Sequence, residues 1–126
     1  MVTPALKLLD ERYSIHRLHN SAEIPPQVFG SAFFNIVKTD DALSIVCPSS
    51  LEIPGERCDP DWACLEVQGP LALDSCGILA ELSRVLAEAG ISLFAVSTFD
   101  TDYLLIKWYK REEATAVLAA AGYRFV

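Results

Sequence analysis

Residues 69–79, Gly-Pro-Leu-Ala-Leu-Asp-Ser-Cys-Gly-Ile-Leu, lead into the most regular helical pattern of the chain. After this stretch, apolar side chains recur every three or four positions, which is the spacing of one helix face. Asp74 or Ser75 can cap the start of such a helix, and Gly90 suits a left-handed residue at its end. The pattern therefore predicts an amphipathic helix over residues 76–89, with one face packed on a core.

In the sequence, strand patterns lie both before and after this helix, and a second helix pattern follows later. The segment after it is so uniformly apolar that we expect a central strand there, returning through a turn as a hairpin. The expected elements are strand 62–67, helix 76–89, strand 91–97, turn 100–102, strand 103–109, helix 111–121 and strand 123–126. The order β-α-β-β-α-β is the ferredoxin-like split motif, an α+β fold with both helices on one face of a four-stranded antiparallel sheet.

The N-terminal half shows a second set of strand signals. Two short strands surround Asp10-Glu11, a turn or single helical turn is expected within residues 20–30, and a hairpin is expected over residues 33–47. Residues 48–61 hold three prolines and one glycine, which is typical of a connector. We therefore place a boundary near residue 60 and expect two modules, residues 1–60 and residues 61–126.

A faint internal repeat relates the two halves. When the chain is laid on itself at an offset of 61, matched pairs include Phe33 with Phe94, Asp41 with Asp102, Leu43 with Leu104 and Ile45 with Ile106. The repeat predicts that the N-terminal module is a degenerate copy of the C-terminal one.

Composition limits the function classes. A chain of 126 residues with 52% hydrophobic residues can form one compact domain or two small modules. The formal net charge of −7 disfavours binding to nucleic acid, which requires clustered basic residues. We find neither a secretory signal nor a stretch of about 20 apolar residues. We expect a cytoplasmic protein with no nucleic-acid or membrane partner.

The cysteines and histidines carry little catalytic signal. Cys76 at a predicted helix start is the one candidate nucleophile, but the sequence assigns no base to it. The four cysteines lack a disulfide framework, although a Cys58–Cys64 bridge remains open. His16 and His19 lie in the other half and match no zinc pattern. We expect no metal, no cofactor and no catalysis.

Three features converge in the C-terminal module to suggest a ligand site. Free amides at the start of the predicted helix suit a carboxylate, and Gly77 has no side chain to block a close approach. Asp102, with Asp100 as a second choice, could pair with an amino or guanidinium group of a zwitterion such as an amino acid. The plain structural alternative is that the loop only caps a helix and the aspartates only belong to a hairpin turn.

These residues resemble the ACT domain. The likeness is to small bacterial proteins with two ACT-like modules in tandem, and also to the cytosolic arginine sensors of the mTORC1 pathway. It is carried by Gly69-Pro-Leu, Asp74-Ser-Cys-Gly-Ile-Leu, Leu86-Ala-Glu-Ala-Gly-Ile-Ser and Ser97-Thr-Phe-Asp-Thr-Asp-Tyr-Leu-Leu. The resemblance implies two tandem ferredoxin-like modules, the first degenerate, that bind a small ligand at their junction. Since the sensors carry twice this unit, it also implies a homodimer or higher homo-oligomer.

The resemblance also implies the positions of ligand contacts. Together with intervening residues and the turn aspartate, the candidate ligand-binding set is Ser75, Cys76, Gly77, Ile78, Leu79, Thr98, Phe99, Asp100 and Asp102. Ser75 stands where the sensors have an acidic contact, which weakens the case for arginine while keeping a site for an amino-acid carboxylate. The rival interpretations are a dimerisation or partner-docking module without a ligand, and an enzyme that depends on Cys76.

Overall fold

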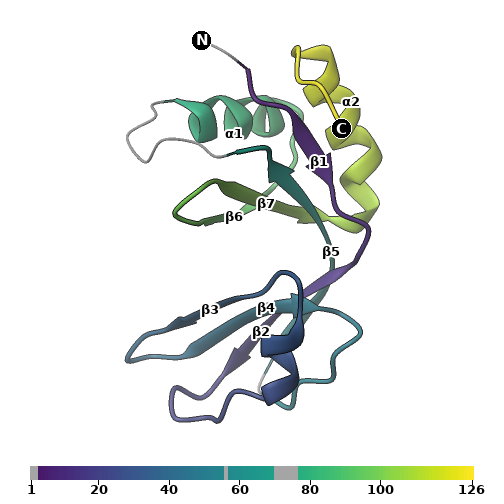
Figure 1. The fold of residues 1–126 in the computed structure, drawn as a ribbon. Helices are drawn as coiled ribbons and strands as arrows, with labels where there is room; N and C mark the ends of the chain where they lie inside the picture. The colour runs from purple at the N-terminus through teal and green to yellow at the C-terminus, as the bar shows by residue number, and fades with distance from the viewer. Residues whose placement is uncertain (1–2, 56, 70–76) are drawn as a thin grey trace. The chain divides into compact units, whose positions relative to one another are not determined.

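The computed structural model of the chain contains strands, two α-helices and two short 3-10 helices within residues 3–55, 57–69 and 77–126, which are the residues that the structure describes (Figure 1). The elements are β1 (Leu6–Leu8), β2 (Tyr13–Leu18), η1 (Pro26–Gly30), β3 (Asn35–Lys38), β4 (Leu43–Pro48), β5 (Arg57–Val67), α1 (Ile78–Glu88), β6 (Phe94–Ser97), β7 (Asp102–Lys107), η2 (Trp108–Lys110) and α2 (Arg111–Ala120).

The chain divides into two compact units. The N-terminal unit is Glu11–Trp62, and the C-terminal unit combines Met1–Asp10 with Ala63–Val126. This division differs from the expected modules, 1–60 and 61–126, mainly in the first ten residues. Those residues join the C-terminal unit because β1 pairs with the second half of β5.

The sheet of the C-terminal unit has the order β1-β5-β7-β6, and β1 runs antiparallel to β5 with Leu6 opposite Val67. A strand over residues 123–126 was expected, and this expectation is wrong. The terminal segment makes only an isolated parallel bridge, with Phe125 opposite Leu6. Strand β1, which was expected in the N-terminal module, pairs with β5 in this sheet instead.

Strand β6 corrects a second expectation. We expected a central strand over residues 91–97, but β6 begins at Phe94 and lies at the end of the strand order, next to β7. Within β6 only Val96 is buried. Ile91 is buried and Leu93 packs on the core, which accounts for the apolar run in the sequence. Both residues precede β6, so the run does not mark a central strand.

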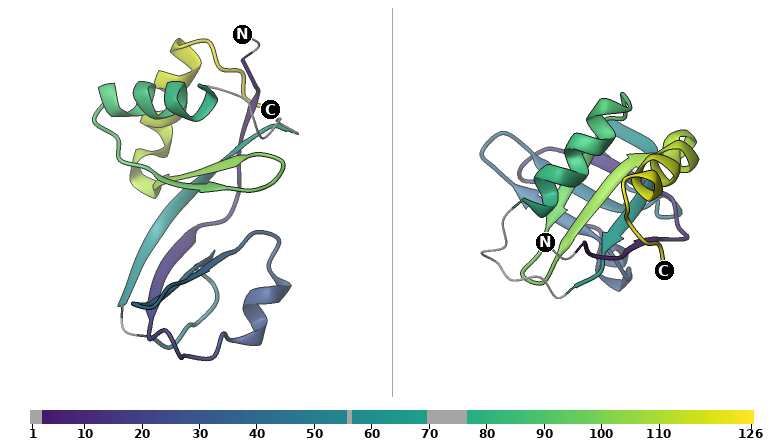
Figure 2. Two further views of the ribbon diagram at one scale, coloured as in Figure 1. Left: turned by 90° about the vertical axis from the view of Figure 1, so that its left-hand side faces the viewer. Right: turned by 90° about the horizontal axis from the view of Figure 1, so that it is seen from above.

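Helices α1 and α2 pack on the same face of this sheet (Figure 2). Helix α1 begins at Ile78, two residues later than expected, and Gly90 has a φ of 74°, the left-handed conformation expected after its end. The predicted caps Asp74 and Ser75 lie outside the described residues. The buried core of the unit comprises Leu6, Ala63, Leu65, Val67, Leu82, Val85, Leu86, Ile91, Leu104, Ile106, Ala114, Leu118 and Tyr123.

The N-terminal unit has the strand order β3-β4-β2-β5. One face of its sheet carries a small core, and the short helix η1 contributes Val28 to it. The connector expected over residues 48–61 is wrong for its last part, since Arg57 to Asp61 form the first half of β5. This half is an exposed edge, where charged side chains and Pro60 discourage pairing with another chain.

A bulge in β5 separates its two halves. Tyr13 is opposite Trp62, but Ile15 is opposite Asp59, so β5 holds one residue more than β2 across this interval. Asp61 absorbs the extra residue with a φ of 65°, a conformation that few side chains tolerate. Its carboxylate also lies 3.4 Å from the Arg12 guanidinium.

The two units contain the same hairpin turn. In the β3–β4 hairpin, the Thr39 amide donates to the carbonyl of Ala42, and the Thr39 hydroxyl accepts the amides of Asp41 and Ala42. In the β6–β7 hairpin, Thr98 makes the equivalent bonds within residues 98–101. The structural offset between the two hairpins is therefore 59, and the offset of 61 inferred from the sequence is wrong.

Neither α1 nor α2, nor either 3-10 helix in the described part of the chain, is long and apolar enough to cross a membrane.

The positive φ of Asp61 at the bulge leads to a prediction about the stability of the fold. Replacing Asp61 by Val should lower the free energy of unfolding by about 1–3 kcal/mol, because a β-branched residue is strained at positive φ. Asp61→Asn is the matched control: it removes the exposed ion pair but tolerates the conformation, so it should change stability by less than about 1 kcal/mol. Urea unfolding followed by tryptophan fluorescence measures both, and equal losses would contradict the strain argument.

Candidate functional site

The residue before α1 is a glycine with space beside its backbone. Gly77 has a φ of 82°, and a Cβ built there would meet no atom within 4 Å. Its carbonyl accepts the amide of Glu81 at 2.9 Å, and no described side chain caps the helix. The amides of the first turn therefore present partial positive charge, which is the property expected to attract a carboxylate.

Four other residues near the start of α1 were predicted to contact the ligand. Ser75 and Cys76 lie outside the described residues. Ile78 and Leu79 are half-buried and pack against the core of the C-terminal unit. Their side chains thus contribute mainly to the core. Contact with a ligand would come from the backbone or from the exposed part of each side chain.

The turn that joins β6 to β7 is held by its own hydroxyl groups. Oγ1 of Thr98 accepts amides from Asp100 and Thr101 at 3.2 and 3.1 Å. Thr101 donates its hydroxyl to the carbonyl of Val67 on β5, which anchors the turn to the sheet. Phe99 is 77% exposed at the tip. The hydroxyl of Thr98 is occupied by hydrogen bonds within the turn. If Thr98 contacts a ligand as predicted, the contact would come from its backbone.

Asp102 is the best-defined charged group of the predicted set. It is the Cα partner of Ser97 across the hairpin, and its Oδ1 accepts the Ser97 hydroxyl at 2.6 Å. The residue is half-buried, and its Oδ2 has no partner among the described residues. A carboxylate can accept several hydrogen bonds, so this second oxygen can receive an ammonium group.

The start of α1 and the tip of the β6–β7 hairpin lie at the same end of the C-terminal unit in both views (Figures 1 and 2). The structure thus gathers the helix amides, an exposed aromatic ring and a carboxylate at one end of one unit.

The cysteines of the described chain divide by burial. Burial raises the pKa of Cys47 to about 11 and that of Cys64 to about 12, with smaller contributions from Cys58 and Glu66 respectively. Cys58 is exposed, and all three thiols are free, so the open alternative of a Cys58–Cys64 bridge is not formed. Among the described residues, no group of three metal-ligating side chains comes together.

His16 is buried on the core face of β2, where Ile45 and Cys58 are its cross-strand partners. Its Nε2 atom has no hydrogen-bond partner in the described part of the chain. Burial lowers its pKa because the charged imidazolium loses hydration. We therefore regard His16 as a neutral core residue.

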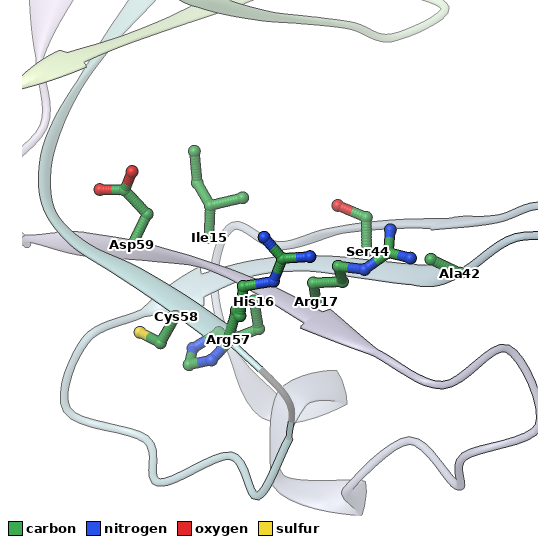
Figure 3. Close-up of a pocket in the computed structure, with 8 residues that line it drawn as sticks. All are labelled: Ile15, His16, Arg17, Ala42, Ser44, Arg57, Cys58 and Asp59. Atoms are coloured by element: carbon green, nitrogen blue, oxygen red, sulfur yellow. The ribbon is translucent and has the colours of Figure 1, made fainter.

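The sequence interpretation missed a depression on the N-terminal unit. It has a volume of about 480 Å³ and lies over β2, β4 and the first half of β5 (Figure 3). It is lined by Ile15, His16, Arg17, Ala42, Ser44, Arg57, Cys58 and Asp59. Arg17, which shares a face of β2 with Tyr13 and Ile15, was a signal for it, but Arg57 at the start of β5 had been placed in a connector.

Comparisons with known proteins give a consistent family. A model described as ACT domain matches residues 57–120, and a second model, described as an N-terminal domain, matches residues 11–56. The first match begins where β5 begins. The resemblance noted from the sequence is thereby confirmed.

Curated relatives include subunit 1 of the cytosolic arginine sensor for mTORC1. The human protein is 30% identical over 112 residues, which cover 81% of this chain and 34% of the sensor. The sensor of Pongo abelii matches with the same identity and coverage. The chain therefore spans about a third of the length of these relatives.

Solved structures agree on the fold. A protein from Agrobacterium tumefaciens is 41% identical with a TM-score of 0.89, covering 100% of this chain and 94% of that one. The regulatory subunit of aspartate kinase from Thermus flavus is 14% identical with a TM-score of 0.68, covering 96% and 99%. At this identity the second likeness is one of fold alone.

The different burial of the three described thiols predicts different rates of alkylation at pH 8. Iodoacetamide should modify Cys58 in the native protein at least about 100-fold faster than Cys47 or Cys64, because a buried thiol with a raised pKa is rarely a thiolate. Peptide mass spectrometry at timed intervals measures the three sites separately. Labelling in urea is the control, and it should bring the rates together; native rates of equal size would contradict the assigned burial.

Because His16 is buried, we predict that the folded protein loses stability in acid. Since its pKa is lowered in the folded state, the unfolded chain binds a proton first, and stability falls as the pH drops below about 6.5. Denaturant unfolding at pH 7.5 and 5.5 should show this loss, and His16→Leu should reduce the difference between the two pH values. An unchanged difference in the variant would assign the pH dependence to other groups.

Proposed function

We propose, from the premise that this chain belongs to the ACT-domain family, that it is a non-catalytic regulatory protein that binds a small molecule. An amino acid is the ligand class that the site chemistry matches best. Binding would act in trans on a partner or on the oligomeric state, since a ligand that prefers one state shifts the population toward it.

The observation that carries the proposal is the pairing of opposite charges at one end of the C-terminal unit. The start of α1, which no described side chain caps, offers amides to a carboxylate, and Gly77 leaves room for it. Asp102 offers a carboxylate oxygen to an ammonium group while keeping its bond to Ser97. A zwitterion satisfies both ends, whereas a simple anion or cation satisfies only one.

The relatives support this ligand class. The human protein that matches most of the chain is named as an arginine sensor, and the Thermus protein with the same fold is a regulatory subunit of aspartate kinase. In our proposal this chain shares the amino-acid class but not arginine specificity, because Ser75 supplies no negative charge where the resemblance implies an acidic contact.

We further propose that the N-terminal unit is a degenerate ACT-like module, so that the chain is a tandem pair whose modules are the two compact units, with the boundary near residue 60 and the first ten residues belonging to the second module. The shared turn of the two hairpins, with threonine at 39 and 98 making the same bonds, supports common descent of the halves. A homodimer or higher homo-oligomer in the cytoplasm would then supply the second pair of modules that the longer relatives carry in one chain.

A ligand-free docking module is the second candidate. Phe99 and Tyr109 are 77% and 75% exposed, and large aromatic rings on a surface are typical anchors of protein partners.

The proposal predicts the outcome of a ligand screen. One or more of the twenty amino acids should raise the melting temperature at millimolar concentration, and Asp102→Asn should weaken the binding of that amino acid at least about tenfold by removing a charge-assisted hydrogen bond. Isothermal titration calorimetry measures the affinity. Asn keeps the size and can still accept the Ser97 hydroxyl, so the variant should fold normally.

Asp41→Asn is the matched control, since it changes a turn aspartate in the other hairpin and should leave the affinity unchanged. Equal affinities of Asp102→Asn and the parent would exclude the proposed ammonium site. A screen in which no amino acid binds would favour the docking module.

A further inference from the structure

Two arginines stand side by side on the face of the N-terminal sheet opposite His16. Arg17 on β2 is the Cα partner of Arg57 on β5, and Arg17 is also opposite Ser44 on β4. The three residues therefore form one row across the strands. Figure 3 shows both guanidinium groups and the Ser44 hydroxyl on the same side of the sheet, whereas His16 and Cys58 point to the other side.

Neither arginine is neutralised by a described neighbour. Both side chains are exposed, and neither makes an ion pair or hydrogen bond with any described residue. Like charges directly opposite each other across two strands destabilise the pair. A chain with seven excess negative charges thus keeps adjacent two cations that pair with none of the residues that the structure describes.

Asp59 is the one carboxylate among the residues that line this depression. It lies in the next cross-strand row, opposite Ile15, and it accepts the indole N–H of Trp62 at 3.2 Å. The charged side chains of the lining are therefore two arginines and one aspartate, a formal charge of +1.

We propose that this depression is a second ligand site, which binds a phosphate group of a small molecule. A guanidinium presents paired N–H donors that match two oxygens of a tetrahedral oxyanion, and two guanidinium groups match its two negative charges. The Ser44 hydroxyl can donate to a third oxygen. The volume of about 480 Å³ exceeds the need of the phosphate alone and falls in the range of small-molecule pockets.

The site is independent of the amino-acid site, because all of its residues belong to the N-terminal unit. Asp102→Asn should therefore leave phosphate binding unchanged. Failure of one proposal does not imply failure of the other.

The test is calorimetric titration with sodium phosphate at pH 7.5, in a zwitterionic buffer held at constant ionic strength with sodium chloride. The parent protein should bind phosphate in the millimolar range or tighter. Arg17→Gln and Arg57→Gln should each weaken binding at least about fivefold, and the double variant should abolish it. Arg124→Gln is the matched control: it removes the same charge from an exposed position outside the depression and should bind like the parent.

Thermal unfolding gives a second readout. High concentrations of phosphate or sulfate stabilise most proteins by exclusion from the surface, and this general effect should remain in the double variant while the low-concentration shift disappears. Without phosphate, Arg17→Gln and Arg57→Gln should melt at or above the parent's temperature, because each relieves a like-charge pair. Phosphate affinities equal to the parent's in both single variants, or no phosphate binding by the parent, would overturn the proposal.

Discussion

Strand β5 has to satisfy two sets of partners along one continuous backbone. Its first half pairs with β2 in the N-terminal unit, and its second half pairs with β1 and lies next to β7 in the C-terminal unit. The first half is exposed from Arg57 to Asp61, whereas the second half is almost entirely buried. The extra residue at Asp61 shifts the alternation of side chains between these halves. Ala63, Leu65 and Val67 of the second half enter the core of the C-terminal unit, whereas the first half contributes no residue to the described core of the N-terminal unit.

Local patterns in the sequence predicted the elements of the C-terminal unit but not all of their neighbours. The helical spacing after Gly77 and the glycine at position 90 defined α1 to within two residues, because both signals act within a few turns of chain. Nothing local distinguishes β1 from the segment at residues 123–126 as the strand beside β5. That choice depends on the register of segments that are far apart in sequence, which a single chain does not reveal.

The internal repeat shows a related limit. Offsets of 59 and 61 differ by two residues, and a shift of two keeps every side chain on the same face of a strand. The apolar alternation of the two hairpins therefore fits both offsets, and chance identities such as Phe33 with Phe94 favoured the wrong one. The hydrogen bonds at Thr39 and Thr98 distinguish them, because a turn has a single place for its hydroxyl acceptor. The pairing register of the two hairpins gives the same offset of 59.

In the proposed amino-acid site, the hydroxyl groups around the hairpin matter as much as its charge. The Ser97 hydroxyl holds Oδ1 of Asp102, and the Thr101 hydroxyl ties the turn to Val67 on β5. These bonds orient the carboxylate before any ligand arrives, which reduces the conformational entropy that binding must overcome. Because the Ser97 bond occupies only Oδ1, an ammonium group can reach Oδ2 without breaking it. The same sequence that closes a tight hairpin thus prepares one end of the site, while the start of α1, placed by a different segment of the C-terminal unit, prepares the other.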